Sequence, residues 1–159
     1  MIGASGGLPT YAGPVEWSFR RFVLHYAKLA ALAGGVDAFL LGSELRGLTT
    51  ARNGAASYPA VDALIDLAAD ARALLGEATT LTYAADWSEY AGHQPNDGSG
   101  DVFFHLDPLW ADENIDVVGV DWYPPLTDWR AGGTHLDAAD APNQHDAAYI
   151  ESRIEAGES

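Results

Sequence analysis

Cysteine is absent from this 159-residue sequence, and lysine occurs only once, as Lys28. The absence of cysteine excludes disulfide bonds, thiolate metal sites, iron–sulfur clusters and cysteine nucleophiles. Basic residues are few as well, because 8 Lys and Arg stand against 23 Asp and Glu, for a formal net charge of −15. A phosphate-binding surface needs clustered basic side chains, so this balance argues against contact with nucleic acid or with an anionic membrane.

Long apolar runs are also missing. The sequence has no run of about 18 apolar residues and no basic-then-apolar start, so we expect neither membrane insertion nor a signal peptide. Its hydrophobic content of 48%, with 11% aromatic residues, is nevertheless typical of a folded chain with a sizeable core. We therefore expect residues 1–159 to form one acidic globular domain, or a fragment of one, with no second domain.

Apolar residues recur at spacings of three and four in several segments, which is typical of helices. They predict helices over residues 15–33, 57–75 and 146–156, and a short or irregular helix over 102–113. In the first helix the predicted apolar stripe consists of Val15, Phe19, Phe22, Tyr26, Leu29 and Ala33. In the second helix it consists of Val61, Leu64, Ile65, Ala68, Ala71, Leu74 and Leu75.

Short apolar runs between these helices predict strands over residues 36–42, 79–84 and 115–121. The first run is nearly continuous, which favours a strand covered on both faces, as in a parallel sheet. Loops rich in Gly, Pro or Asp are expected over residues 1–14, 86–101 and 126–145.

The alternation of helices and strands predicts an α/β fold built from βα units. An open doubly wound sheet is one possibility at this length. However, only three strands are convincing, and a (β/α)₈ barrel takes about 250 residues. Three to four βα units in 159 residues therefore predict a partial (β/α)₈ TIM barrel.

Polar and aromatic residues follow each predicted strand, where chemistry collects in parallel α/β sheets. The candidates are Ser43 and Glu44 after the first strand, Asp86 and Trp87 after the second, and Asp121, Trp122 and Tyr123 after the third. Aromatic faces stack on sugar rings while carboxylates hold sugar hydroxyls, so this composition favours a carbohydrate site.

Longer motifs at these positions resemble known glycosidases. Leu41-Gly42-Ser43-Glu44-Leu45 resembles the strand-4 motif of retaining TIM-barrel glycoside hydrolases, in which a small polar residue precedes the acid/base glutamate. Residues 116–126 resemble the strand-6 motif of β-mannanase-like members of that clan. Over nearly its whole length, including residues 17–21, 33–39, 83–90 and 93–95, the chain is similar to the TIM-barrel-like domain of gene transfer agent and phage tail proteins.

This resemblance implies a glycosidase-like domain in the tail or baseplate of a phage-like particle, made in the bacterial cytoplasm. Its expected partners are a cell-envelope polysaccharide or peptidoglycan-type glycan, which it hydrolyses or binds during attachment and DNA delivery, and other tail or baseplate proteins. The resemblance also implies that the chain holds strands 4 to 6, with strands 1 to 3 before residue 1 and strands 7 and 8 after Ser159. The alternative is a non-catalytic structural or glycan-binding baseplate module.

Glu44 is the candidate acid/base, because retaining hydrolysis needs two carboxyl groups about 5 Å apart, one of them kept protonated. Partial burial at the mouth of the barrel would keep Glu44 protonated. The alternative is a structural role, in which Glu44 forms an ion pair with Arg46 or Arg20 and only stabilises the loop. In the resembling family the second carboxylate, the nucleophile, lies on strand 7. The remaining candidates here, Glu151, Glu155 and Glu158, lie on a polar terminal helix and not at the end of a strand. Because the nucleophile is then missing, we expect the 159-residue chain alone to be inactive.

The other candidates are substrate contacts, with ordinary packing at the rim of the core as the alternative. They are Ser43, Asp86, Trp87, His105, Asp121, Trp122 and Tyr123. In related barrels a strand-6 tyrosine, here Tyr123, hydrogen-bonds the nucleophile or the sugar.

A metal site is suggested by the spacing of four residues between His93, Asp97, Asp101 and His105. Interspersed Gly and Pro make a helix improbable there, so we expect neither a metal nor a cofactor.

Overall fold

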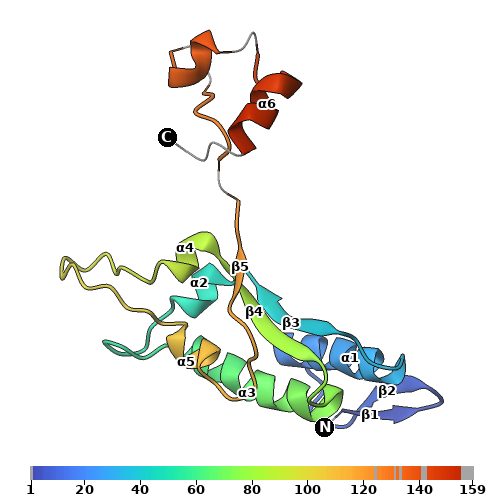
Figure 1. Ribbon diagram of the computed structural model, residues 1–159. Helices are drawn as coiled ribbons and strands as arrows, with labels where there is room; N and C mark the ends of the chain where they lie inside the picture. The colour runs from blue at the N-terminus through green and yellow to red at the C-terminus, as the bar shows by residue number, and fades with distance from the viewer. Residues whose placement is uncertain (1, 124, 131, 133, 141–142, 155–159) are drawn as a thin grey trace. The chain divides into compact units, whose positions relative to one another are not determined.

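The computed structural model describes residues 2–123, 125–130, 132, 134–140 and 143–154 (Figure 1). Within it the chain divides into two compact units, residues 1–122 and residues 123–159. The first unit holds both sheets and the three candidate strands, and the second holds short helical segments. Whether residues 1–159 belong to one domain stays a prediction.

An antiparallel hairpin opens the first unit. Strands β1 (Ile2–Ser5) and β2 (Leu8–Tyr11) pair through Ser5 and Leu8, and Gly6 and Gly7 turn between them with φ values of 58° and 76°. Two consecutive positive φ values are what a tight hairpin turn requires, and glycine adopts them without a steric penalty. The prediction of a loop is therefore wrong for residues 2–11, since Gly-Gly between two short segments is itself a hairpin signal.

Helix α1 (Phe19–Leu32) begins four residues later than predicted, because the Ser18 hydroxyl oxygen caps it by accepting the Arg21 N–H at 3.2 Å. The helix packs against α3 (Pro59–Leu75) and buries Val23, Leu24 and Ala27. Phe22 and Tyr26, which belong to the predicted stripe, are 60% and 51% exposed. The core face of α1 is therefore not the predicted one, because α1 carries apolar residues on two faces.

Helix α3 ends at Leu75 as predicted and begins at Pro59, two residues later than predicted. Pro59 lies in its first turn, where its missing N–H is not needed, and Gly76 follows its last residue with φ 80°. Its buried apolar residues are Val61, Leu64, Leu67, Ala68 and Ala71, while Ile65, Leu74 and Leu75 pack against the core with partial exposure. The predicted apolar face is thus confirmed, with Leu67 added to it.

The central sheet consists of β3 (Ala38–Ser43), β4 (Thr80–Asp86) and β5 (Gly119–Asp121), all parallel, with β4 in the middle (Figure 1). The three predicted parallel strands are confirmed, and the described residues form no closed barrel. The residues from Leu81 to Ala85 are all buried. In contrast, β3 lies at the edge of the described sheet and Leu40 is 51% exposed, so the expected cover on both faces of β3 is wrong.

Strand β5 is shorter than the predicted segment, although the residues before it are still tied to β4. The Asp116 N–H donates to the Leu81 carbonyl at 3.0 Å, and the Thr82 hydroxyl donates to the Val117 carbonyl at 2.7 Å. At Gly119 a Cβ atom would lie 2.7 Å from a carbonyl oxygen of β4. Only glycine permits this close approach, so Gly119 sets where ladder pairing begins.

Short helices follow the strands in the first unit. They are α2 (Arg46–Thr49), α4 (Trp87–Tyr90) and α5 (Asp107–Trp110). The last of them lies inside the predicted irregular helix over 102–113, whereas α2 and α4 were not expected. Each has only four residues, too few for apolar periodicity to detect, and among the three only α4 has a side-chain cap, from Asp86.

The second unit contains a 3₁₀ turn, Leu136–Ala139, and α6 (Ala147–Ile154). The buried carboxylate of Asp137 connects them, because it accepts the Asp128 N–H (2.9 Å), the Tyr149 hydroxyl (2.6 Å) and an Arg153 N–H (2.9 Å). The hydrogen bond from Tyr149 is the main reason that the pKa of Asp137 is lowered. The helix predicted over 146–156 is confirmed over residues 147–154, and Glu155 and Glu158 lie outside the described residues.

Arg72, in the last turn of α3, joins the carboxyl end of that helix to the amino end of β4 and to the segment before β5. Its buried guanidinium donates to the carbonyl oxygens of Gly76 (3.0 Å), Thr79 (2.7 Å) and Asn114 (3.0 Å) and to the Asp116 carboxylate (2.6 Å). Asp116 also accepts the Leu81 N–H at 2.7 Å. One side chain therefore satisfies several groups that would otherwise have no partner away from water.

We expect Arg72→Met to lower the free energy of unfolding by about 3 kcal/mol, because it takes the donor away from three carbonyl oxygens and removes the ion pair of Asp116. The matched control is Arg20→Met, since Arg20 pairs with Asp70 on the exposed surface and such pairs contribute at most about 1 kcal/mol. Urea unfolding of the two variants checks the difference. Equal losses would contradict a special role for Arg72.

Candidate functional site

The carboxyl end of β3 contains a bulge. Leu40 pairs with Thr82 and Ser43 pairs with Ala84, so β3 has one more residue than β4 between these two pairs. A bulge bends its strand and changes the direction of the side chains that follow. Ser43 is the last residue of β3, and Glu44, the candidate acid/base, follows it directly.

Glu44 has an unusual backbone conformation. Its φ is 55°, and it is the only non-glycine residue with positive φ in the described part of the chain. The left-handed region costs a residue with a side chain roughly 1–2 kcal/mol. Strand β4 holds it there, because the Glu44 N–H donates to the Ala84 carbonyl at 2.9 Å and the Leu45 N–H donates to the Tyr83 hydroxyl oxygen at 2.8 Å. Backbone strain of this kind concentrates at functional sites.

The Glu44 side chain is exposed. The prediction that Glu44 is partly buried is therefore wrong. The bracing alternative is not supported either, since Arg20 pairs with Asp70 and no ion pair joins Glu44 to Arg46 among the residues that the structure describes. The carboxyl group thus faces solvent, without a cationic partner in that part of the chain.

Two further carboxylates lie at the same edge of the sheet. Asp86 and Asp121 are register partners at the carboxyl ends of β4 and β5, and the Ser43 hydroxyl donates a hydrogen bond to Asp121. Ser43, Glu44, Asp86 and Asp121 therefore lie at the carboxyl ends of three adjacent parallel strands. This is the placement that the sequence analysis predicted for them.

Asp86 also caps helix α4. Its carboxylate accepts the Ser88 N–H at 2.9 Å and the Ser88 hydroxyl, and these hydrogen bonds lower the pKa of Asp86. Trp87 and Trp122 are 49% and 63% exposed, and their rings meet edge to face with centroids 6.4 Å apart. The site therefore presents carboxyl oxygens as acceptors beside two exposed aromatic rings.

Sequence reasoning missed Glu89, which is only 1% exposed. Its carboxylate accepts the Asp86 N–H (3.0 Å), the Tyr83 hydroxyl (3.0 and 3.1 Å to its two oxygens) and the Thr49 hydroxyl. The signal was present, because Asp86-Trp87-Ser88-Glu89 is a capping-box sequence in which the N-cap residue and the residue three positions later bond each other's backbone.

His105 lies in the interior, with 4% exposure. Its Nδ1 is 3.4 Å from the Phe103 carbonyl oxygen, and its ring lies 5.1 Å from that of Tyr58 and 5.9 Å from that of His93. Burial is the main cause that lowers the pKa of His105 and of His93. Its proposed contact with substrate stays a prediction, and this position gives it a packing role.

The remaining sequence candidates lie elsewhere. Asp97 pairs with Arg52 at 3.1 Å, and the described residues contain no cluster of three His, Asp or Glu able to hold a metal ion. Tyr123 belongs to the second unit and is 69% exposed, and its expected contact with the site stays a prediction.

None of the helices in the described ranges has the length and apolar character that a membrane-spanning segment needs.

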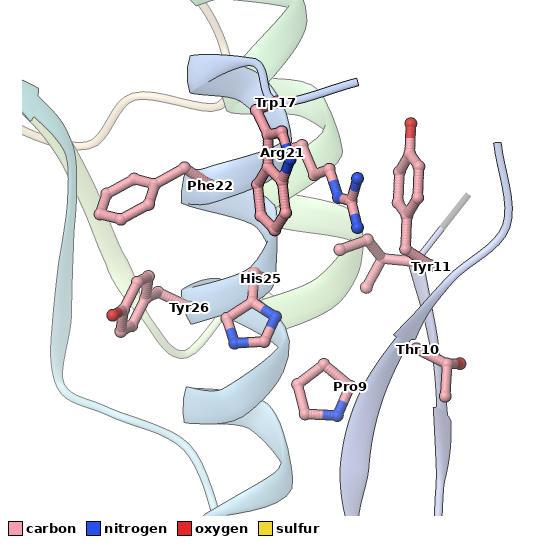
Figure 2. Close-up of a pocket in the computed structure, with 9 residues that line it drawn as sticks. Pro9, Thr10, Tyr11, Trp17, Arg21, Phe22, His25 and Tyr26 are labelled. Carbon is pink, nitrogen blue, oxygen red and sulfur yellow. The ribbon is translucent and has the colours of Figure 1, made fainter. Parts of the chain in front are cut away.

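A separate pocket of about 430 Å³ lies between β2 and α1. In Figure 2, Tyr11 and Trp17 flank the side chain of Arg21, whose guanidinium carbon lies 4.2 Å from the Tyr11 ring centroid and 4.6 Å from that of Trp17. Phe22 and Tyr26 line the pocket from α1 (Figure 2). The described residues that line it include His25 but no carboxylate, so the pocket lacks the pair of carboxyl groups that retaining hydrolysis uses.

Comparison with known proteins gives a family for this fold. Residues 17–159 match the family model described as the GTA TIM-barrel-like domain, where GTA stands for gene transfer agent. The chain therefore belongs to the family of GTA TIM-barrel-like domains, and the resemblance seen in the sequence is confirmed. This membership indicates an association with gene transfer agents, which are phage-like particles. A search of curated proteins and a search of solved structures gave no match.

The buried histidine makes folding stability depend on pH. The folded chain keeps His105 neutral because its pKa is lowered, whereas the unfolded chain takes up a proton near pH 6.5, roughly the value of a free histidine. The stabilisation is therefore complete above that pH and declines as the pH falls towards the lowered value.

We expect His105→Gln to show a smaller fall in melting temperature than the wild type between about pH 7.5 and about pH 5.5. His25→Gln is the control, because His25 is exposed on α1. Thermal unfolding followed by circular dichroism at the two pH values checks this. A fall in His105→Gln as large as in the wild type would contradict the assignment.

Proposed function

We propose that this chain is the central part of a glycoside-hydrolase-like barrel domain of a gene transfer agent particle, with Glu44 as the acid/base carboxyl. In this proposal β3, β4 and β5 correspond to strands 4 to 6 of the barrel. The observation that carries it is the left-handed conformation of Glu44, held at the carboxyl edge of a parallel sheet by two hydrogen bonds to β4. A loop that served packing alone would gain from glycine at this position.

The chemistry assigns distinct roles to the neighbouring groups. In this proposal a protonated Glu44 carboxyl donates its proton to the glycosidic oxygen, while a second carboxylate about 5 Å away attacks the anomeric carbon. Asp121 accepts the Ser43 hydroxyl and Asp86 caps α4, so both are already held as acceptors and suit sugar hydroxyls better than nucleophilic attack. We therefore place the nucleophile on a strand other than β3, β4 and β5.

The proposed substrate is a cell-envelope glycan. The exposed rings of Trp87 and Trp122 lie beside the carboxylates, as is usual where a protein stacks on the apolar face of a sugar. The same observation supports the second candidate function, a glycan-binding module without hydrolysis, because stacking and hydroxyl contacts need no nucleophile. In both cases the domain works within a particle, so other tail or baseplate proteins are its proposed partners.

The test measures release of soluble sugar from cell-wall and capsular glycans by the full-length protein that carries this domain. We expect Glu44→Gln to lower release about 100-fold or more, because a general acid contributes about that much. Glu77→Gln is the matched control, since Glu77 is an exposed glutamate before the amino end of β4. The 159-residue chain assayed alone is expected to release nothing.

The binding arm of this test separates the two candidate functions. Sedimentation with insoluble glycan should be weakened by Trp87→Ala and by Trp122→Ala if these rings stack on sugar. Binding without release in the full-length protein favours the module without hydrolysis. Release that is equal in the wild type and Glu44→Gln would overturn the acid/base assignment.

A further inference from the structure

The hydroxyl group of Tyr83 connects the Glu44 turn with a buried carboxylate. Tyr83 lies on β4 and is fully buried. Its hydroxyl oxygen accepts the Leu45 N–H at 2.8 Å, and the same hydroxyl lies 3.0 and 3.1 Å from the two carboxylate oxygens of Glu89. The peptide that follows Glu44 is therefore linked to Glu89 through one phenolic oxygen.

The direction of these hydrogen bonds is fixed by chemistry. A backbone N–H can only donate, so the Tyr83 oxygen must accept from Leu45 and give its single proton to Glu89. Burial raises the pKa of Tyr83 far above its usual range, with the nearby Glu89 adding to the effect. Tyr83 therefore keeps its proton at any physiological pH, and its lone pairs remain available to Leu45.

Glu89 is organised entirely as an acceptor. Besides the Tyr83 hydroxyl it accepts the Asp86 N–H and the Thr49 hydroxyl, and within the described ranges it has no ion-pair partner. A buried carboxylate without a cation is costly unless hydrogen bonds satisfy it. Three donors from β4, α2 and the turn into α4 meet this requirement. The arrangement holds the elements around Glu44 in one geometry.

We propose that Glu89 is a positioning residue for Glu44, acting through the Tyr83 hydroxyl to fix the Leu45 N–H and hence the left-handed turn that presents the Glu44 carboxyl. The functional part of this inference rests on the proposed role of Glu44, whereas the geometric part does not. Glu89 itself is buried and touches no substrate. It orients the acid/base group, as the groups behind a catalytic side chain generally do.

The first test is Tyr83→Phe, which removes only the hydroxyl. We expect the Leu45 amide to exchange with solvent at least about tenfold faster than in the wild type, the size expected from the loss of one hydrogen bond. The matched control is Thr49→Val, which removes another donor to Glu89 but leaves the bond between Tyr83 and Leu45 in place. Hydrogen exchange of single amides measured by NMR compares the variants, with the Leu45 rate unchanged in Thr49→Val.

A second variant keeps the inference testable if Tyr83→Phe does not fold. Glu89→Gln retains one acceptor oxygen, but its NH₂ group competes as a donor for the Tyr83 oxygen. We expect faster Leu45 exchange than in the wild type and slower exchange than in Tyr83→Phe. Wild-type Leu45 exchange in either folded variant overturns the positioning role.

The activity readout separates this inference from the proposed function. If Glu44→Gln abolishes glycan release, Tyr83→Phe should lower kcat and leave KM unchanged, because the turn and not the sugar contacts has moved. An unchanged kcat in that situation contradicts the inference. If Glu44→Gln releases glycan like the wild type, the proposed function fails, and the Leu45 exchange rate alone decides whether Glu89 positions the turn.

Discussion

The burial of β4 is the constraint on which the rest of the first unit depends. Leu81, Tyr83 and Ala85 lie in the hydrophobic core on the side of α3, and Thr82 and Ala84 on the opposite face are buried as well. A strand buried on both faces needs hydrogen-bonded neighbours at both edges, because unpaired backbone groups are costly away from water. β3 and β5 supply them, and their parallel direction brings the candidate residues to one edge.

The same strand determines the geometry of the site. Its Ala84 carbonyl and Tyr83 hydroxyl hold the backbone on both sides of Glu44, and its last residue, Asp86, begins the capping box that contains Glu89. The chemistry proposed for the exposed edge thus depends on groups buried beneath it. A chain of hydrogen bonds in a low-dielectric interior is stronger than the same bonds in water, which suits it to hold a strained turn.

Apolar patterning was enough to predict the three parallel strands, α3, and the placement of Ser43, Glu44, Asp86 and Asp121 at one edge. It could not predict the core face of α1, because that helix is apolar on two sides and only its contact with α3 selects between them. The bulge before Ser43 and the exposure of Glu44 depend on register and long-range pairing, which no local pattern encodes. Glu89 differs, since its capping-box signal was present in the sequence and was overlooked.

The central claim is that the fold holds Glu44 in the left-handed region, and the most direct measurement compares the stabilities of Glu44→Gly and Glu44→Ala. Both variants remove the carboxyl, so their difference reports only the backbone. If φ is near 55°, glycine relieves strain that alanine keeps, and Glu44→Gly should be the more stable by about 1 kcal/mol in urea unfolding. An alanine variant that is equally or more stable would contradict the account, because alanine is favoured at negative φ.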